Sequence, residues 1–221
     1  MKFKKPLYVL VVFTLTLTYT APAQNSESPV FYEIGDDFSL SISGSSNVRD
    51  WDADAERVRE NIAFGPSLVE WLRGEAVNID EMDPADFEQM KWLNTVRLSV
   101  RAESMDSGIS ALNSTMYEHL DTENHPTIIY SISEVMDMEP GEEPDQLILY
   151  VVGTTRAAGE DNSVEHQVLL TRAEGGSVMV SGDVEMKITD FNIEPPTFMR
   201  GALVTDDVFT VHFDFHFAPM E

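Results

Sequence analysis

The sequence contains no cysteine, which excludes a disulfide framework and a thiolate nucleophile. The chain of 221 residues must therefore be stabilised by an apolar core, and it is long enough to form one. It also lacks the G-x-S-x-G, H-E-x-x-H and P-loop patterns of common hydrolases, metalloproteases and nucleotide-binding enzymes. These absences predict a protein that is not an enzyme, with no catalytic residues, no metal site and no cofactor.

Lysine is scarce, and acidic residues greatly outnumber basic ones. Asp and Glu total 39 against 14 Lys and Arg, which gives a formal net charge of −25 at pH 7. Binding to nucleic acid or to an anionic membrane surface is disfavoured, because both require a positive patch. Carboxylates keep a surface hydrated, and salt screens their mutual repulsion. We interpret the composition as halophilic, with an ordinary acidic exported protein as the alternative.

The apolar segment near the N-terminus, residues 7–17, is too short and too rich in threonine for a good membrane span. Three lysines in residues 2–5 precede it, and the small residues of 21–23 follow it as a signal-peptidase site. We predict a signal peptide over residues 1–23 and one mature domain over residues 24–221, periplasmic or secreted and not stably inserted in a membrane. Loss of the three lysines changes the formal charge from −25 to −28. No cysteine follows the cleavage site, so the alternative is a retained apolar anchor rather than a lipoprotein.

Beyond Val30 the dominant pattern is an alternation of apolar and polar residues, which predicts half-buried strands. Turn-forming pairs such as Pro140-Gly141 and Gly175-Gly176 separate these segments. Several strands joined by short turns are typical of an antiparallel sandwich or barrel. Residues 52–92 carry no clear pattern and are predicted to form a long connection. The predicted strands cover residues 31–43, 45–51, 96–100, 128–132, 146–155, 164–173, 177–191 and 207–217.

One segment, residues 108–126, departs from the strand pattern. Its apolar residues Ile109, Leu112, Met116 and Leu120 fall along one helical stripe. A short amphipathic helix in a β-rich chain must lay this stripe on an apolar surface, and the end of a barrel provides one.

Five segments carry a resemblance to a known family. They are GSSNVRDW (44–51), MYEHL (116–120), HPTIIY (125–130), VVGTTR (151–156) and MKITDFNIEPP (186–196). In their order and spacing they resemble the YceI-like, or polyisoprenoid-binding-protein-like, family. The similarity runs from about Val30 to Ala218, nearly the whole mature chain.

This resemblance implies an all-β fold, an extended eight-stranded antiparallel lipocalin-like barrel with one short helix near an opening. It also implies an elongated apolar lumen that holds an isoprenoid-type lipid, such as a polyprenol or a quinone tail. The predicted function is therefore an exported lipid carrier, and the alternative is an envelope structural or interaction module with a filled barrel. A homodimer formed by edge pairing is left open. The predicted ligand-binding residues are Leu98, Val100, Leu112, Met116, Leu120, Ile128, Tyr130, Phe191, Phe209, Val211, Phe213 and Phe215.

The last predicted strand presents two different faces. Every second residue from Phe209 to Phe217 is apolar, and these side chains either line an open lumen or fill the barrel themselves. The opposite face carries His212, Asp214 and His216. Neighbouring side chains on one face of a strand lie about 7 Å apart, too far to converge on one metal ion. We interpret this face as solvated, with a hydrolase or a metal-dependent enzyme as the alternative.

Overall fold

A computed structural model describes residues 28–75, 92–198 and 202–220. The predicted signal peptide, residues 1–23, lies outside the described residues. The described part is mostly β-structure, with two short α-helices, α1 (Pro66–Leu72) and α3 (Ser110–His119). The long strands are β1 (Val30–Ser46), β3 (Val58–Phe64), β4 (Leu93–Arg101), β6 (Thr127–Pro140), β7 (Gln146–Ala157), β8 (Glu160–Arg172), β9 (Val178–Lys187) and β11 (Leu203–Pro219). The shorter strands are β2 (Trp51–Ala55), β5 (Met105–Asp106) and β10 (Thr197–Phe198).

The strands form an antiparallel sheet that closes on itself. The order around the ring is β1, β3, β4, β6, β7, β8, β9 and β11, and pairing of β11 with β1 completes it. β2 continues the path of β3 beside β1, because β3 pairs with the start of β1 and β2 with residues 41–44. The structure thus confirms the expected eight-stranded antiparallel barrel.

The barrel is elongated because its closing strands are long. β1 and β11 have 17 residues each, and at about 3.3 Å per residue such a strand extends roughly 55 Å. Alternation along the strands separates the interior from the surface. In β7, for example, Leu147, Leu149 and Val151 are fully buried while the residues between them are half-buried.

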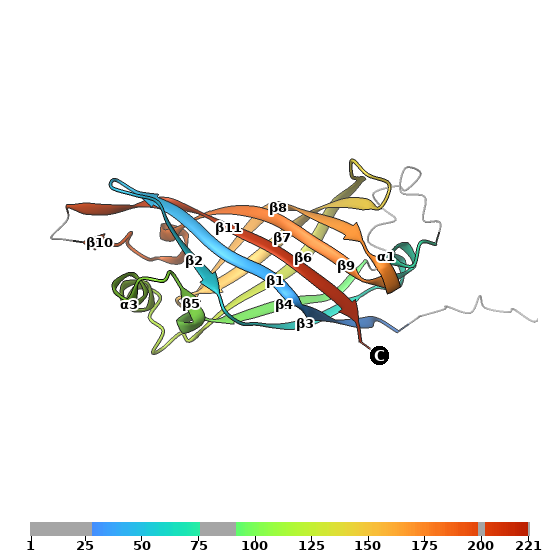
Figure 1. The fold of residues 1–221 in the computed structure, drawn as a ribbon, viewed down its shortest axis with the longest axis horizontal. Helices are drawn as coiled ribbons and strands as arrows, with labels where there is room; N and C mark the ends of the chain where they lie inside the picture. Colours follow the sequence, from blue (N-terminus) through green and yellow to red (C-terminus); the bar gives the residue numbers. More distant parts are fainter. Residues whose placement is uncertain (1–27, 76–91, 199–201, 221) are drawn as a thin grey trace, which may run out of the picture.

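The end of the barrel that carries α1 is filled. Leu68 and Leu72 of α1 are buried in one cluster with the inward side chains of β7, β8 and β11. Arg172 holds the helix in place by donating from Nη1 to the carbonyl oxygen of Trp71 over 2.9 Å. α1 and α3 lie at opposite ends of the barrel (Figure 1). The apolar cavity lined by α3 lies toward the opposite end of the barrel.

The predicted strand over residues 45–51 is wrong. β1 runs on to Ser46, and residues 47–50 form the turn that leads into β2. The Ser46 hydroxyl accepts hydrogen bonds from the backbone N–H groups of Val48 and Arg49 and donates to the Arg49 carbonyl. Serine commonly stabilises turns in this way, so a local side-chain interaction overrides the apparent alternation.

The predicted long connection is also wrong over residues 52–64, most of which lie in β2 and β3. Trp51, Ala53 and Ala55 share the inward face of β2, and the two buried alanines are too small to give a strong apolar signal in the sequence. Pairing with β1 and β4 stabilises these strands despite their many charged residues. Residues 76–91 of the same segment lie outside the described residues.

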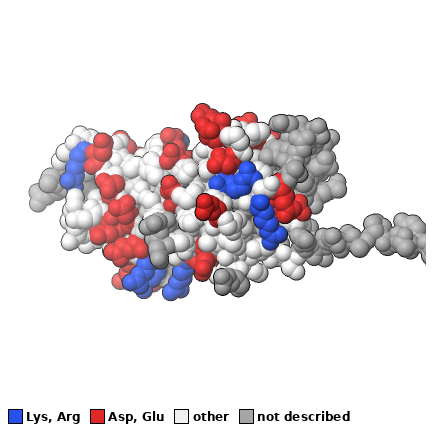
Figure 2. All heavy atoms as spheres, turned by 45° about the vertical axis from the view of Figure 1, so that its right-hand side comes forward, with Lys and Arg blue, Asp and Glu red and all other residues white. Residues whose placement is uncertain are grey.

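Acidic side chains are spread over the face of the molecule in Figure 2, and basic side chains are few on it. This distribution agrees with the 39 Asp and Glu residues in the sequence. The carboxylates are therefore mostly solvated and repel one another across the surface.

We expect sodium chloride to stabilise the protein against this repulsion. Raising the concentration from a few millimolar to about 1 M shortens the Debye length to about 3 Å. The melting temperature should rise by about 5–10 °C, which corresponds to roughly 2–3 kcal/mol for a domain of this size. Thermal unfolding followed by circular dichroism measures the change, and a melting temperature that stays flat across the range contradicts the halophilic interpretation.

Candidate functional site

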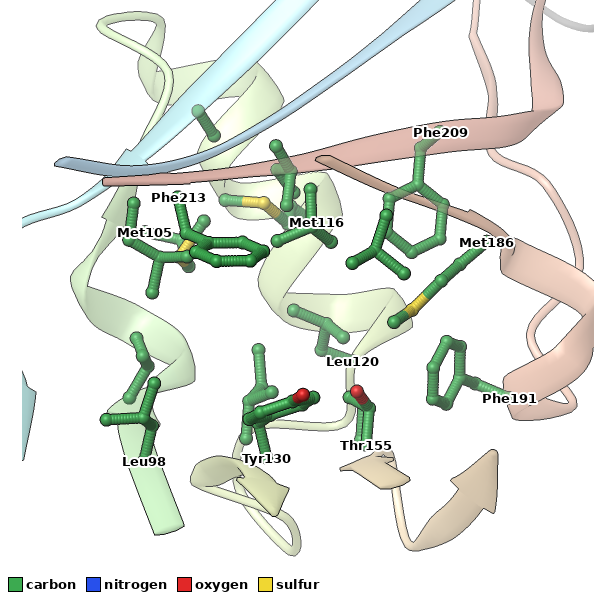
Figure 3. A pocket seen from close by; sticks show the side chains of 18 of the residues that line it. Leu98, Met105, Met116, Leu120, Tyr130, Thr155, Met186, Phe191, Phe209 and Phe213 are labelled. Carbon is green, nitrogen blue, oxygen red and sulfur yellow. The ribbon is translucent and has the colours of Figure 1, made fainter. Parts of the chain in front are cut away.

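An apolar cavity of about 280 Å³ lies inside the barrel toward the α3 end. Its wall is formed by inward side chains of every long strand except β3, together with β2, β5, α3 and the short helical turn η4 (Ile188–Phe191). The side chains are mostly aliphatic, aromatic or methionine (Figure 3). The cavity matches the size and character of sites for small apolar ligands, which begin at about 300 Å³.

All of the residues predicted to bind a ligand line this cavity. The alternation in β11 directs Phe209, Val211, Phe213, Phe215 and Phe217 to its interior. The full predicted set is Leu98, Val100, Leu112, Met116, Leu120, Ile128, Tyr130, Phe191, Phe209, Val211, Phe213 and Phe215. Their role in ligand binding stays a prediction, while their common location is a feature of the structure.

The predicted helix covers the cavity, with one correction. Leu112 and Met116 of α3 and the following Leu120 line the cavity, and Figure 3 shows Met116 and Leu120 pointing into it. Ile109 does not join them, because it is the N-cap residue of α3 and is 40% exposed. The residue before the first helical turn has extended backbone, so the helical periodicity does not apply to it.

The aromatic residues of β11 lie at different depths. Phe215 is 2% exposed and Phe217 is 3% exposed, and both belong to the packed core at the α1 end. Phe213 and Phe209 are half-buried along the open part of the cavity. The rings of Phe213 and Phe215 are stacked, with centroids 6.3 Å apart. Phe215 therefore forms part of the cavity floor, whereas Phe213 forms part of its side wall.

Several lining residues were not predicted. Trp51 lies over Gly44, where a Cβ atom would collide with the indole ring, and its Nε1 donates to the Ser45 carbonyl over 3.2 Å. This contact explains why the segment 44–51 begins with glycine and ends with tryptophan. Other apolar lining residues outside the predicted set include Leu40, Ile42, Ala53, Met105, Val180, Val184 and Met186.

A small group of polar side chains interrupts the apolar wall. The Tyr130 hydroxyl lies 2.9 Å from Nε2 of His166, and Nδ1 of His166 lies 3.2 Å from the Val164 carbonyl oxygen. Thr155 pairs directly with Tyr130 across β6 and β7, and their oxygen atoms lie on the cavity side of the wall (Figure 3). Tyr130 belongs to the predicted ligand-binding set, whereas Thr155 and His166 do not, and all three line the cavity.

Burial changes the ionisation of this polar group. It raises the pKa of the Tyr130 phenol above its ordinary value. It lowers the pKa of the His166 imidazole from its ordinary value of 6.5, while the hydrogen bond to the Val164 carbonyl acts in the opposite direction. Both side chains are therefore neutral at pH 7, which suits a wall that faces an apolar cavity.

The comparisons with known proteins agree with this geometry. A model of the YceI-like domain matches residues 50–217, which is more than half of the chain. The chain belongs to the YceI-like family. No curated protein matches the sequence.

Solved structures share the fold of this YceI-like barrel at low sequence identity. BcnA from Burkholderia cenocepacia is 14% identical with a TM-score of 0.57, and the match covers 83% of this chain and 99% of that one. A domain from Saccharophagus degradans, described as polyisoprenoid-binding and implicated in plant cell wall breakdown, is 14% identical with a TM-score of 0.60 over 86% and 99%. A variant of the Campylobacter jejuni YceI protein is 10% identical with a TM-score of 0.51 over 96% and 99%. These structures share the barrel.

The outer wall of the YceI-like barrel brings a serine, a histidine and an aspartate together. Nε2 of His212 lies 2.7 Å from the Ser43 hydroxyl, and Nδ1 lies 2.5 Å from Oδ1 of Asp183. The order of contacts is that of a serine hydrolase triad. However, the Asp183 side chain is 71% exposed, and none of the three residues lines the cavity. Water around the carboxylate weakens its effect on the histidine.

The backbone around Ser43 offers no oxyanion hole. Ser43 is paired with β11 on one side and with β2 on the other, so its amide belongs to the sheet. An oxyanion hole needs free N–H groups aimed at the reacting oxygen. Within the described ranges, no three His, Asp or Glu side chains are placed to hold a metal ion. None of the helices in those ranges is long and apolar enough to cross a membrane.

The pH dependence of stability should report on the half-buried His166. Because its folded-state pKa is lowered, the unfolded chain binds this proton more readily than the folded chain. The contribution of neutral His166 is present above the unfolded pKa of about 6.5 and is lost as the pH falls toward the folded value. We expect the melting temperature of the parent to fall more steeply between pH 7 and pH 5 than that of His166→Gln. Parallel curves for the two proteins would show that His166 does not titrate in this way.

Proposed function

We propose that this YceI-like barrel binds and carries an apolar, isoprenoid-type lipid, and that it is not an enzyme. The observation that carries the proposal is the cavity of about 280 Å³, whose wall is almost wholly apolar. Removing an isoprenoid chain from water into such a cavity is favourable by about 25 cal/mol per Å² of apolar area. A family relative described as polyisoprenoid-binding supports the same ligand class.

We further propose that the protein acts outside the cytoplasm, in the periplasm or as a secreted protein. The support is the lysine-rich start, apolar segment and small-residue site within residues 1–23. An aqueous compartment would require a lipid to be shielded from water during transfer, and an enclosed apolar cavity performs that task. The acidic surface favours a soluble carrier over one that adheres to anionic membranes or nucleic acid.

Native mass spectrometry of protein purified from its own host tests the carrier function. We expect a bound species whose mass matches an isoprenoid lipid, released on mild activation and extractable into organic solvent. The same lipid should bind again to the delipidated protein with saturation. Protein that carries no lipid and shows no saturable isoprenoid binding would favour the alternative, a structural or interaction module in the envelope.

Among the described residues, the triad-like contacts of His212 favour an enzyme as the second candidate function. We expect Ser43→Ala to leave hydrolysis of p-nitrophenyl acetate unchanged, because the exposed site lacks both a substrate pocket and an oxyanion hole. His216→Ala is a matched control on the same strand face, since it removes an imidazole outside the triad-like contacts. Hydrolysis by the parent that Ser43→Ala abolishes and His216→Ala preserves would establish a hydrolase.

A further inference from the structure

We propose that the cavity seats a short isoprenoid alcohol of about ten to fifteen carbons, with its hydroxyl group between Tyr130 and Thr155. This inference rests on the proposed function and specifies the ligand class and its orientation. It is carried by the hydrogen-bonding capacity of the polar wall and by the size of the cavity.

The hydrogen bonds of His166 and Tyr130 determine which donors and acceptors of the cavity wall remain free for a ligand. A carbonyl oxygen only accepts, so Nδ1 of His166 must carry the proton that it donates to Val164. Nε2 of the neutral ring then accepts, and the Tyr130 hydroxyl donates to it over 2.9 Å. The hydroxyl proton of Tyr130 is therefore used in the hydrogen bond to His166, and the Tyr130 oxygen can only accept a hydrogen bond from a ligand.

Thr155 supplies the complementary group. Its hydroxyl lines the cavity and makes no hydrogen bond to any of the described residues, and it stands beside Tyr130 in direct cross-strand register. The wall therefore offers a donor at Thr155 and an acceptor at Tyr130. A ligand hydroxyl donates and accepts at once and satisfies both, whereas a carbonyl group leaves Tyr130 without a partner and a hydrocarbon leaves both without one.

Gly153 shows that the wall is built around this polar pair. A Cβ atom at position 153 would lie 2.5 Å from Cε1 of His166 and 2.7 Å from the Tyr130 hydroxyl oxygen. Any side chain there would push both rings out of their hydrogen-bonded arrangement. The absence of a side chain at Gly153 leaves room for both rings, which meet edge to face over this position with an interplanar angle of 63°.

The volume limits the length of the ligand. A cavity of 150 Å³ in another protein binds benzene, and the cavity of about 280 Å³ here is nearly twice that size. It therefore encloses about twice the carbon content of benzene, which corresponds to two or three isoprene units. Across the cavity from Tyr130 and Thr155, the side chains of Met116, Phe209 and Phe213 provide apolar contacts for the hydrocarbon chain of the ligand (Figure 3).

Isothermal titration calorimetry of delipidated protein tests the orientation with three probes that share one carbon skeleton: farnesol, farnesal and β-farnesene. Farnesol should bind at least tenfold more tightly than farnesal, and farnesene most weakly. Thr155→Val keeps the shape of the side chain and should lower farnesol affinity about tenfold while leaving farnesene unchanged. Thr154→Val is the matched control, because its hydroxyl lies outside the cavity and contacts Ser163.

A series of prenols tests the length. Affinity should increase from geraniol to farnesol and then stay level for geranylgeraniol, since further units find no space inside. If the three farnesyl probes bind equally well to the parent and to Thr155→Val, the hydroxyl site is wrong while the lipid carrier stands. A continued tenfold gain for each added isoprene unit overturns the size limit. If no probe binds with saturation, the proposed carrier function itself fails.

Discussion

Phe215→Ala is expected to lower the free energy of unfolding by about 3–5 kcal/mol, the usual cost of removing a phenylalanine from a packed core. The side chain is 2% exposed, and its ring lies between those of Phe213 and Phe217, with centroid distances of 6.3 and 5.5 Å. For a domain of this size the loss corresponds to a melting temperature lower by roughly 6–20 °C. Thermal or denaturant unfolding of the lipid-free protein measures it.

Phe213→Ala is the matched comparison, because it removes the same side chain two residues away on the same face. Phe213 is half-buried against the cavity rather than packed on all sides. Its loss should cost the lipid-free protein clearly less stability and should weaken farnesol binding tenfold or more, about 1.4 kcal/mol. Equal stability losses for the two variants, without any effect on binding, would mean that the barrel is filled at both positions.

The contrast between these two phenylalanines shows what the sequence can predict about a barrel. Alternation from Phe209 to Phe217 correctly predicts which side chains face inward, because a strand directs successive residues to opposite faces. It carries no information on depth. Phe215 is buried because α1 and its neighbours fill one end of the barrel, and that helix belongs to a segment without a clear pattern.

The inward position of His166 could have been predicted from the alternation of residues in β8. His166 lies in register with Val164, Val168 and Leu170, so the same alternation places its side chain inside the barrel. The polar residues of β11 form a more conspicuous pattern because His212, Asp214 and His216 repeat every second residue, yet His212 lies on the outer wall. A single polar residue among inward apolar residues indicates a site in the interior more directly than a cluster on a solvated face.

Long-range strand pairing accounts for most of the features that the sequence pattern does not predict. β2 and β3 contain many charged residues, and the buried alanines of β2 are small, so these strands form because β1 and β4 supply hydrogen-bonding partners. The register that brings Thr155 beside Tyr130 likewise depends on how β6 and β7 pair, with irregularities along the ladder. Local periodicity cannot reveal such positions in advance.

Met116→Asp is expected to weaken farnesol binding at least a hundredfold, about 2.8 kcal/mol. Met116 is half-buried on the inner face of α3, and its side chain points into the cavity (Figure 3). A bound lipid would remove water from an aspartate at this position, and an unpaired carboxylate in an apolar site is strongly unfavourable. Without ligand, the carboxylate can remain hydrated at the mouth of the cavity, so the free energy of unfolding should change much less than the affinity.

Ser114→Asp is the control that distinguishes a charge placed in the cavity from the same charge added to the protein surface. Ser114 lies on the exposed face of the same helix, two residues away, and does not line the cavity. This variant adds one negative charge to an acidic surface and should bind farnesol as the parent does. If both variants lose affinity alike, the cause is net charge rather than contact with the ligand. If Met116→Asp binds as well as the parent, α3 does not cover the bound lipid, because a carboxylate in contact with an apolar chain cannot be neutral in its effect on binding.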